Sequence, residues 1–291
     1  MKEIVVISGK GGTGKTSLTA SFAMLAQDDI IVADCDVDAA DMHLLLKPDF
    51  AKTEDFYSGE LAIIDQDECN SCNLCFEVCR FDAITVNGRQ YSVDQVNCEG
   101  CAYCSRVCAV EAITMQPQIA GKVFTSSIKT GATMVHARLS IGAENSGKLV
   151  AKVKKEAKNL AKTQNKSFVL VDGSPGVGCP VVSSLSGADY VVFVTEPTVS
   201  GLHDLERVND LVKRFKIKSG CIINKYDINE DVSKQIQIFL SKENITHIAN
   251  LPYVENFTKA MTLGKTIIEY DKILSEILRN SWKNILKDCC E

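Results

Sequence analysis

The sequence of 291 residues contains no long apolar run. No stretch approaches the roughly 18 to 20 apolar residues that a membrane-spanning helix requires, and residues 1–9 lack the apolar core of a signal peptide. These absences predict a cytoplasmic protein with no membrane span. Basic residues are not in excess either, because 32 Lys and Arg stand against 37 Asp and Glu, a net charge of −5. This balance argues against a protein that holds nucleic acid on a uniformly basic surface.

Histidine is scarce, whereas cysteine is abundant. The four histidines are scattered without the spacing of metal ligands, but there are 13 cysteines. Because cytoplasmic thiols are kept reduced, this number favours metal or cluster ligation over a disulfide framework.

Six short runs rich in Val and Ile predict buried strands. They lie at 4–7, 30–33, 168–171, 190–194, 221–223 and 248–251. Helical spacing of apolar residues separates them, as at 202–215 and 273–286. The pattern predicts an α/β fold with a mostly parallel sheet flanked by helices. We expect the last helix to pack on the sheet, and the lysine-rich helix at about 147–166 to present a solvated face.

A segment of different character, residues 61–118, interrupts this pattern. It holds eight cysteines, and residues 69–85 align with 98–114 at an offset of 29 residues, with every cysteine matched. Asn87-Gly88 between the halves predicts a two-residue hairpin. We therefore expect a small two-fold module at 61–118, inserted into a discontinuous domain formed by 1–60 and 119–291.

A phosphate-binding loop follows the first predicted strand. Residues 9–16 fit the pattern G-x-x-x-x-G-K-[ST] and precede a predicted helix. The glycines let backbone N–H groups surround phosphate oxygens, Lys15 supplies a positive charge, and the Thr16 hydroxyl is placed to bind Mg²⁺. The predicted nucleotide-binding residues of this loop are Gly9, Lys10, Gly11, Gly12, Thr13, Gly14, Lys15, Thr16 and Ser17.

Lys10, a second lysine in the loop, makes the sequence resemble the MinD/ParA/nitrogenase-iron-protein class of P-loop ATPases. The resemblance implies a nucleotide-sandwich dimer, with itself or with a paralogue, in which Lys10 reaches the partner's phosphates. It implies that Lys10 and Lys15 stabilise the transferred phosphoryl group and that Asp36 orients the attacking water. The Mg²⁺ ligands that it implies are Thr16, Asp34 and Asp172.

Two further loops are expected to flank the base. Asn224 ends one predicted strand and Pro252 follows the last one, where this fold class reads the base. The tetrapeptide 224–227, Asn-Lys-Tyr-Asp, also resembles the guanine-reading motif of GTPases. We favour ATP because the loop around Lys10 matches the ATP-using branch, and GTP remains the alternative.

The cysteines of 61–118 repeat the spacing C-x₂-C-x₂-C-x₃-C, which resembles that of two-cluster bacterial ferredoxins. In that arrangement three thiolates of one run and the fourth of the other hold one [4Fe–4S] cluster. The predicted ligand sets are Cys69, Cys72, Cys75 and Cys108 for the first cluster, and Cys98, Cys101, Cys104 and Cys79 for the second. Zinc is the alternative, but the repeated 2-2-3 spacing fits clusters more narrowly.

Three of the five remaining cysteines can be interpreted from their positions in the sequence. Cys35 and Cys221 lie in or beside buried strands and are interpreted as core residues. Cys179 follows Gly173-Ser174-Pro175-Gly176, the expected second switch, so it serves either packing or the relay of a metal or cluster.

The whole chain resembles MinD-superfamily ATPases with an inserted ferredoxin domain. The resemblance implies a Mg²⁺-dependent ATPase whose dimer switch is coupled to electron transfer through two [4Fe–4S] clusters, serving a redox protein or metallocofactor assembly. Two alternatives stay open: a scaffold that hands clusters on, and a positioning ATPase that uses the module for docking. Neither the partner nor the reduction potentials follow from the sequence.

Overall fold

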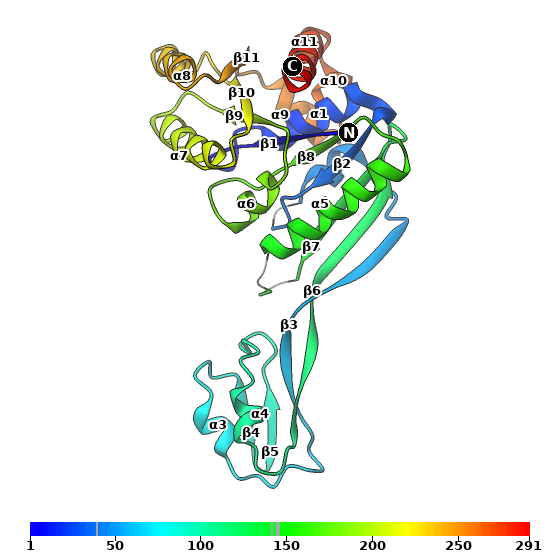
Figure 1. Cartoon of the computed structure of the whole chain (residues 1–291), viewed down its shortest axis with the longest axis vertical. Helices are drawn as coiled ribbons and strands as arrows, with labels where there is room; N and C mark the ends of the chain where they lie inside the picture. The colour runs from blue at the N-terminus through cyan, green and yellow to red at the C-terminus, as the bar shows by residue number, and fades with distance from the viewer. Residues whose placement is uncertain (39, 141, 144–145) are drawn as a thin grey trace. The chain divides into compact units, whose positions relative to one another are not determined.

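The computed structural model describes all residues except 39, 141, 144 and 145 (Figure 1). The chain forms two compact units. The first comprises residues 1–54, 123–138 and 146–291, and the second comprises 55–122 and 139–145. The boundaries expected at 61 and 118 fall inside two long strands, β3 (Lys52–Ile64) and β6 (Ile113–Ser127), each of which contributes residues to both units.

The large sheet of the described chain has nine strands, in the order β11-β10-β9-β1-β8-β2-β7-β6-β3. The strands from β11 to β7 pair in parallel, which confirms the predicted α/β fold with its mostly parallel sheet. All six predicted strands are present. The strands not yet bounded are β1 (Lys2–Ile7), β2 (Ile30–Asp34), β7 (Thr133–Leu139), β8 (Phe168–Asp172), β9 (Tyr190–Thr195), β10 (Lys218–Asn224) and β11 (Thr246–Leu251).

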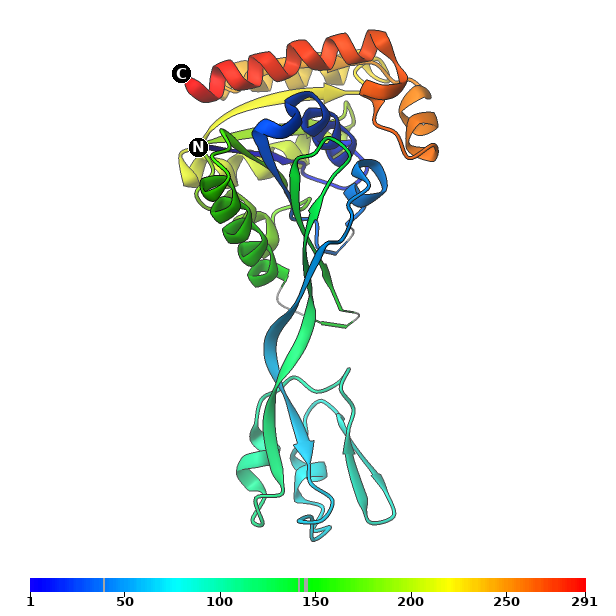
Figure 2. The ribbon, with the colours of Figure 1, turned by 90° about the vertical axis from the view of Figure 1, so that its right-hand side faces the viewer.

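Helices cover both faces of the sheet in the first unit. They are α1 (Lys15–Ala26), the 3₁₀ helix η1 (Gln27–Asp29), α2 (Met42–Leu46), α5 (Ser146–Thr163), α6 (Cys179–Leu185), α7 (Val199–Phe215), α8 (Glu230–Lys242), α9 (Asn256–Thr262), α10 (Ile267–Tyr270) and α11 (Lys272–Cys290). In Figure 2 the sheet is seen between α11, in red, and α5, in green.

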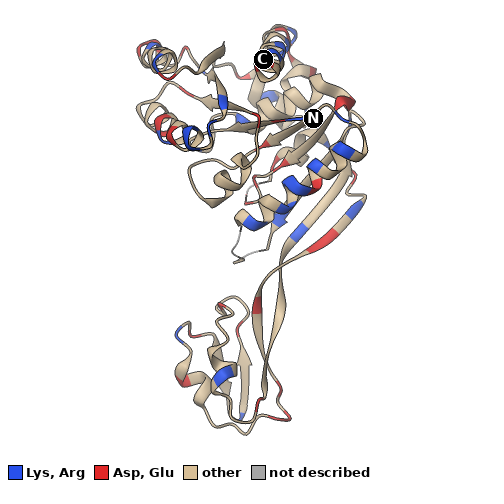
Figure 3. Cartoon of the chain, viewed as in Figure 1, with Lys and Arg blue, Asp and Glu red and all other residues tan. Residues whose placement is uncertain are grey.

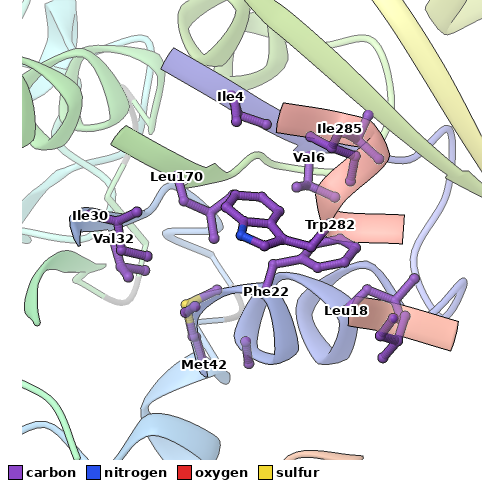
Figure 4. Packing of buried hydrophobic residues seen from close by; sticks show 14 of the residues in the cluster. Ile4, Val6, Leu18, Phe22, Ile30, Val32, Met42, Leu170, Trp282 and Ile285 are labelled. Atoms are coloured by element: carbon purple, nitrogen blue, oxygen red, sulfur yellow. The ribbon is translucent and has the colours of Figure 1, made fainter. Parts of the chain in front are cut away.

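The hydrophobic core on one face of the sheet joins the two ends of the chain. Phe22 of α1 stacks on Trp282 of α11 with 5.4 Å between ring centroids, and both pack with Ile4 and Val6 of β1 (Figure 4). Because these side chains are removed from water, the C-terminal helix is fixed on the sheet. This confirms that α11 packs on the sheet.

The opposite face of β1 holds a buried ion cluster. Successive side chains of a strand point to opposite faces, so Glu3 points away from Ile4. Its carboxylate contacts Lys154 Nζ at 2.7 Å and Lys158 Nζ at 2.9 Å, both from α5. The expectation of a wholly solvated lysine face on α5 is therefore wrong at Lys154, which is 4% exposed and donates to the Ser184 and Ser186 carbonyls. The lysines of α5 appear as blue bands along this helix in Figure 3.

The second unit repeats its backbone as well as its sequence. Asp65 N–H donates to the Ala112 carbonyl, and Asp94 N–H, 29 residues later, donates to the Ala83 carbonyl. Left-handed residues recur at the same offset, in the pairs Ser71 and Gly100, Asn73 and Ala102, and Asp82 and Glu111. The remaining elements are α3 (Leu74–Val78), α4 (Tyr103–Val107) and the antiparallel strands β4 (Ile84–Asn87) and β5 (Gln90–Val93). The predicted two-residue hairpin joins β4 and β5, but its loop is Gly88-Arg89, one residue later than expected, because Asn87 pairs with Gln90.

Candidate functional site

The loop between β1 and α1 is shaped by its glycines. Gly12 and Gly14 have φ values of 79° and 93°, which side chains other than glycine rarely adopt. A Cβ atom on Gly14 would also lie 2.5 Å from Nδ2 of Asn224. The local sequence therefore lets the loop curl tightly before α1 begins at Lys15, which leaves backbone N–H groups at the helix N-terminus for an anion.

Lys15 and Thr16 meet the end of β8. Lys15 Nζ lies 2.8 Å from Asp172 Oδ2, and the Thr16 hydroxyl donates to the same oxygen at 2.7 Å. Thr19 donates to Asp172 Oδ1 at 2.7 Å. Burial acts to lower the pKa of Lys15, but the charges of Asp172 and Asp36 outweigh it and raise that pKa. Lys15 is therefore held as a cation beside a fixed carboxylate.

The carboxylates after β2 differ in their surroundings. Parallel pairing sets Asp34 opposite Asp172, and Asp34 Oδ1 accepts from Asp36 N–H at 3.1 Å. Burial and the charge of Asp172 raise the pKa of Asp34 well above its usual range, and Asp34 Oδ2 has no hydrogen-bond partner among the described residues. Asp36 lies 3.5 Å from Lys15 Nζ and lines the open cavity. Asp36 thus lies in the cavity beside Lys15, whereas Asp34 is buried behind it at the end of β2.

A cavity of about 550 Å³ opens at this edge of the sheet. Its lining includes residues 11–17 of the loop, Asp36, Asp38, Ser174 and Met261. Neither Asn224 nor Pro252 lines it. The cavity is large enough for a nucleotide-sized ligand.

Lys10 is held within its own chain. Its Nζ lies 2.8 Å from Glu196 Oε1 and donates to the hydroxyls of Thr198 and Ser200 at 3.1 and 3.0 Å. Glu196 follows β9, and the two lysines that it contacts, Lys10 and Lys225, counteract burial and lower its pKa. The predicted contact of Lys10 with a partner's phosphates remains a prediction.

Asn224, one of the two residues expected to read the base, supports the phosphate loop together with its neighbour Lys225. Asn224 Nδ2 donates to the Thr13 carbonyl at 2.8 Å, and Lys225 Nζ donates to the Gly12 carbonyl at 3.2 Å while pairing with Glu196 at 2.8 Å. The two base-side loops are tied together, because Tyr253 N–H donates to Asp227 Oδ1 at 2.7 Å. Base reading by Asn224 and Pro252 stays a prediction.

The expected second switch is bonded to two other segments of the site. Gly173 and Gly176 N–H groups donate to the Val6 and Ser8 carbonyls, at 2.8 and 2.9 Å. The Ser174 hydroxyl donates to the Cys35 carbonyl at 2.7 Å. These bonds connect the expected second switch to β1 and to the loop after β2. We therefore expect a movement of one of the three segments to shift the other two. Cys179, at the start of α6, is exposed.

The second unit contains two cysteine-lined recesses. Recess 1 is lined by Cys69, Cys72, Cys75 and Cys108, together with Tyr91 and apolar side chains. Recess 2 is lined by Cys79, Cys98, Cys101 and Cys104, again among mostly apolar side chains. Each recess therefore combines three cysteines of one repeat with the fourth of the other. The 13 cysteines are free thiols, and Cys35 and Cys221 are buried, as expected of core residues.

The thiols of each recess line the same space, but they do not converge on one common position. Among the described residues, no three His, Cys, Asp or Glu side chains converge closely enough to hold a metal ion as they stand. Cys75 of recess 1 and Cys104 of recess 2 occupy equivalent positions of the repeat. Burial raises the pKa of both thiols, and neighbouring cysteines add to the effect.

Comparison with protein families identifies the family of the chain. Residues 4–267 match the CobQ/CobB/MinD/ParA nucleotide-binding domain. The chain belongs to this MinD/ParA family. An uncharacterized protein of Methanocaldococcus jannaschii, MJ0578, is 34% identical over 241 residues, which cover 82% of this chain and 83% of that protein. Another from that organism, MJ0579, is 26% identical over 285 residues and 95% of each chain.

Solved structures of the MinD/ParA family share the fold. The septum site-determining protein MinD of Pyrococcus horikoshii, in complex with Mg-ADP, has a TM-score of 0.59 at 17% identity, over 98% of this chain and 95% of that one. MinD of Aquifex aeolicus, in a MinC:MinD complex, has a TM-score of 0.57 at 17% identity, over 99% and 96%. No helix in the described ranges has the length and apolar character to cross a membrane.

Sequence reasoning overlooked three residues around the MinD/ParA nucleotide site: Glu196, Lys225 and Met261. Glu196 follows an apolar strand directly, which is the signal that identified Asp172, and so could have been found. Lys225 lies inside a motif read for its base contacts. Met261 had no signal, because its place at the cavity depends on how α9 packs.

Proposed function

We propose that this member of the MinD/ParA family is a Mg²⁺-dependent ATPase that carries two [4Fe–4S] clusters and couples its nucleotide-driven dimer to electron transfer. The observation that carries the proposal is the pair of recesses in the second unit. Each is lined by the four cysteines of one predicted ligand set, with the fourth cysteine crossing between repeats.

The donor set of each recess fits a [4Fe–4S] cluster. In each recess four free thiols lie among mostly apolar side chains, and no described Lys or Arg lines either recess. Bound there, such clusters would supply one-electron chemistry. The chain would hold them through Cys69, Cys72, Cys75 and Cys108, and through Cys98, Cys101, Cys104 and Cys79.

The nucleotide chemistry rests on side chains that are already arranged around the cavity. Lys15 and the N–H groups of the loop would hold phosphate oxygens, while Thr16 and Asp172 form the oxygen pair best placed for Mg²⁺. Asp36, which lines the cavity beside Lys15, would orient the attacking water. Lys10 would leave Glu196 for a phosphate across the dimer, which need not be a homodimer.

The crossed ligand sets give a direct test of cluster binding. Anaerobically reconstituted protein should contain about eight iron and eight sulfide per chain. Cys75→Ser and Cys108→Ser should remove the same electron paramagnetic resonance (EPR) signal, while Cys104→Ser and Cys79→Ser remove the other. Cys35→Ser is the matched control. Bound zinc without iron, or loss of signals by repeat rather than by recess, would overturn the proposal.

The coupling of nucleotide binding to electron transfer is tested on the same cluster-loaded protein. Mg-ATP should change the reduction potentials or the reoxidation rate of the clusters, and Lys10→Ala should abolish the change. Potentials that are identical with and without nucleotide would favour a positioning ATPase that uses the module for docking. Transfer of iron to an apo-acceptor would favour the scaffold alternative.

A further inference from the structure

The two recesses are related by the internal repeat but present different surfaces. Leu74 and Val110 line recess 1, and the residues at their equivalent positions, Tyr103 and Phe81, line recess 2. Tyr103 is 52% exposed and Phe81 is 43% exposed. Large aromatic side chains left half-exposed beside a functional site are typical of interaction surfaces.

The charges at the two recesses also differ. Glu99 lines recess 2, is exposed and forms no ion pair among the described residues, whereas its repeat equivalent at recess 1 is Asn70. The surrounding segment 55–122 contains ten acidic and four basic residues. A partner with a cationic rim would therefore be attracted to this unit, and a partner with an acidic rim would be repelled.

We propose that recess 2 is the docking surface for a one-electron redox protein whose contact face has an apolar centre and a rim of Lys or Arg. Phe81 and Tyr103 would pack against the centre, and Glu99 would pair with the rim. Such contacts fit the ordinary anatomy of an interface, with aromatic anchors inside a polar border. The exposed Cys101 beside them would bring the partner close to the second predicted cluster. The inference rests on the proposed iron–sulfur function.

Binding to a defined probe tests the surface without turnover. Cytochrome c, a small haem protein with a lysine-rich face, would be titrated in its oxidised form into oxidised, cluster-loaded protein by calorimetry. Tyr103→Ser and Glu99→Gln should each weaken binding at least about fivefold, or about 1 kcal/mol. An acidic flavodoxin should bind more weakly than cytochrome c, and added salt should weaken the cytochrome complex.

Recess 1 supplies matched controls. Leu74→Ser is the repeat equivalent of Tyr103→Ser, and Glu111→Gln removes an exposed carboxylate next to the lining of recess 1. Both should leave binding unchanged. An equal loss of cytochrome c affinity in the recess 1 and recess 2 variants would overturn the inference. So would a loss of affinity confined to the recess 1 variants.

Electron transfer gives a second readout. The loaded protein would be reduced with dithionite and freed of excess reductant. One electron would then pass from a reduced cluster, which is reoxidised, to each ferric haem, which becomes ferrous, and Tyr103→Ser should slow this step more than Leu74→Ser. Iron content and EPR signals of every variant separate the two proposals. Full cluster content with unaltered binding in Tyr103→Ser would refute only the docking surface, whereas absence of clusters from wild type would refute the proposed function.

Discussion

The two units of this chain are stabilised internally by different kinds of interaction. In the nucleotide-binding unit the polar groups of the site satisfy one another, as Lys15 does with Asp172 and Lys10 with Glu196, above a core in which Phe22 stacks on Trp282. In the cysteine-rich unit the buried cluster comprises Ala62, Cys75, Ile84, Tyr91 and Ile113, and the other cysteines line recesses. The first site is held by contacts between its own side chains, whereas we expect the second unit to depend on the proposed clusters for its stability.

Removal of the proposed clusters should produce the largest difference in stability between the two units. Anaerobic chelation of the loaded protein should make the amides of 55–122 exchange rapidly, because the small core contributes little stability without metal–thiolate bonds. The first unit should keep its protection. Hydrogen exchange with mass spectrometry measures both, and the Cys75→Ser/Cys104→Ser double variant should resemble the chelated protein. Undiminished protection of 55–122 would show that the second unit folds without clusters.

Asp36→Ala should separate nucleotide binding from hydrolysis. Loss of the group that orients water should lower ATP turnover by about 10²- to 10⁴-fold, with nucleotide affinity nearly unchanged. Steady-state ATPase assays and equilibrium binding measure the two effects. Asp38→Ala, which changes a neighbouring cavity carboxylate, is the control with the smaller expected effect. Turnover that stays at the wild-type level would remove Asp36 from the proposed mechanism.

Trp282→Ala should destabilise the first unit alone. Truncation of this nearly buried ring should lower the free energy of unfolding by about 3–5 kcal/mol. Ile273→Ala on the same helix, 77% exposed, should cost less than about 0.5 kcal/mol. Denaturant unfolding followed by circular dichroism measures stability, while the EPR signals report the second unit. Parallel loss of those signals would mean that the two units unfold together.

Glu196→Gln should have the smallest effect of these four changes, and the effect should be on nucleotide affinity. Removal of this carboxylate leaves Lys10 and Lys225 without their shared counter-charge, so ADP should bind about two- to fivefold more tightly at low salt. Calorimetry at two salt concentrations measures the change. Glu206→Gln, at an exposed position of α7, should have no effect. Weaker binding would show that Glu196 supports the loop more than it restrains the lysines.

Much of the first unit was predictable because its signals are local. Val- and Ile-rich runs gave six strands, and one octapeptide located the phosphate loop. Three strands, β3, β6 and β7, were not predicted. β7 carries His136 and Arg138 among apolar residues, and it is stabilised by parallel pairing with β2, a long-range contact that no local pattern reports.

Side-chain direction was harder to predict than position. Base reading by Asn224 stays a prediction, but the bond of its amide to the Thr13 carbonyl was not foreseen, because the two groups meet only when β10 and the phosphate loop are assembled. Lys154 was expected in solvent, but Glu3, distant in the sequence, accounts for its burial. The cysteine spacing, by contrast, predicted which four thiols would share each recess.

The crossing of the repeats makes each half of the second unit depend on the other. One repeat alone offers three thiols to one recess and its last thiol to the other, so it completes neither. Two copies of a peptide about half as long would complete both by pairing around a two-fold axis. The second unit therefore has the arrangement of a small two-fold dimer within one chain, and a change in one repeat also alters the recess that it shares with the other.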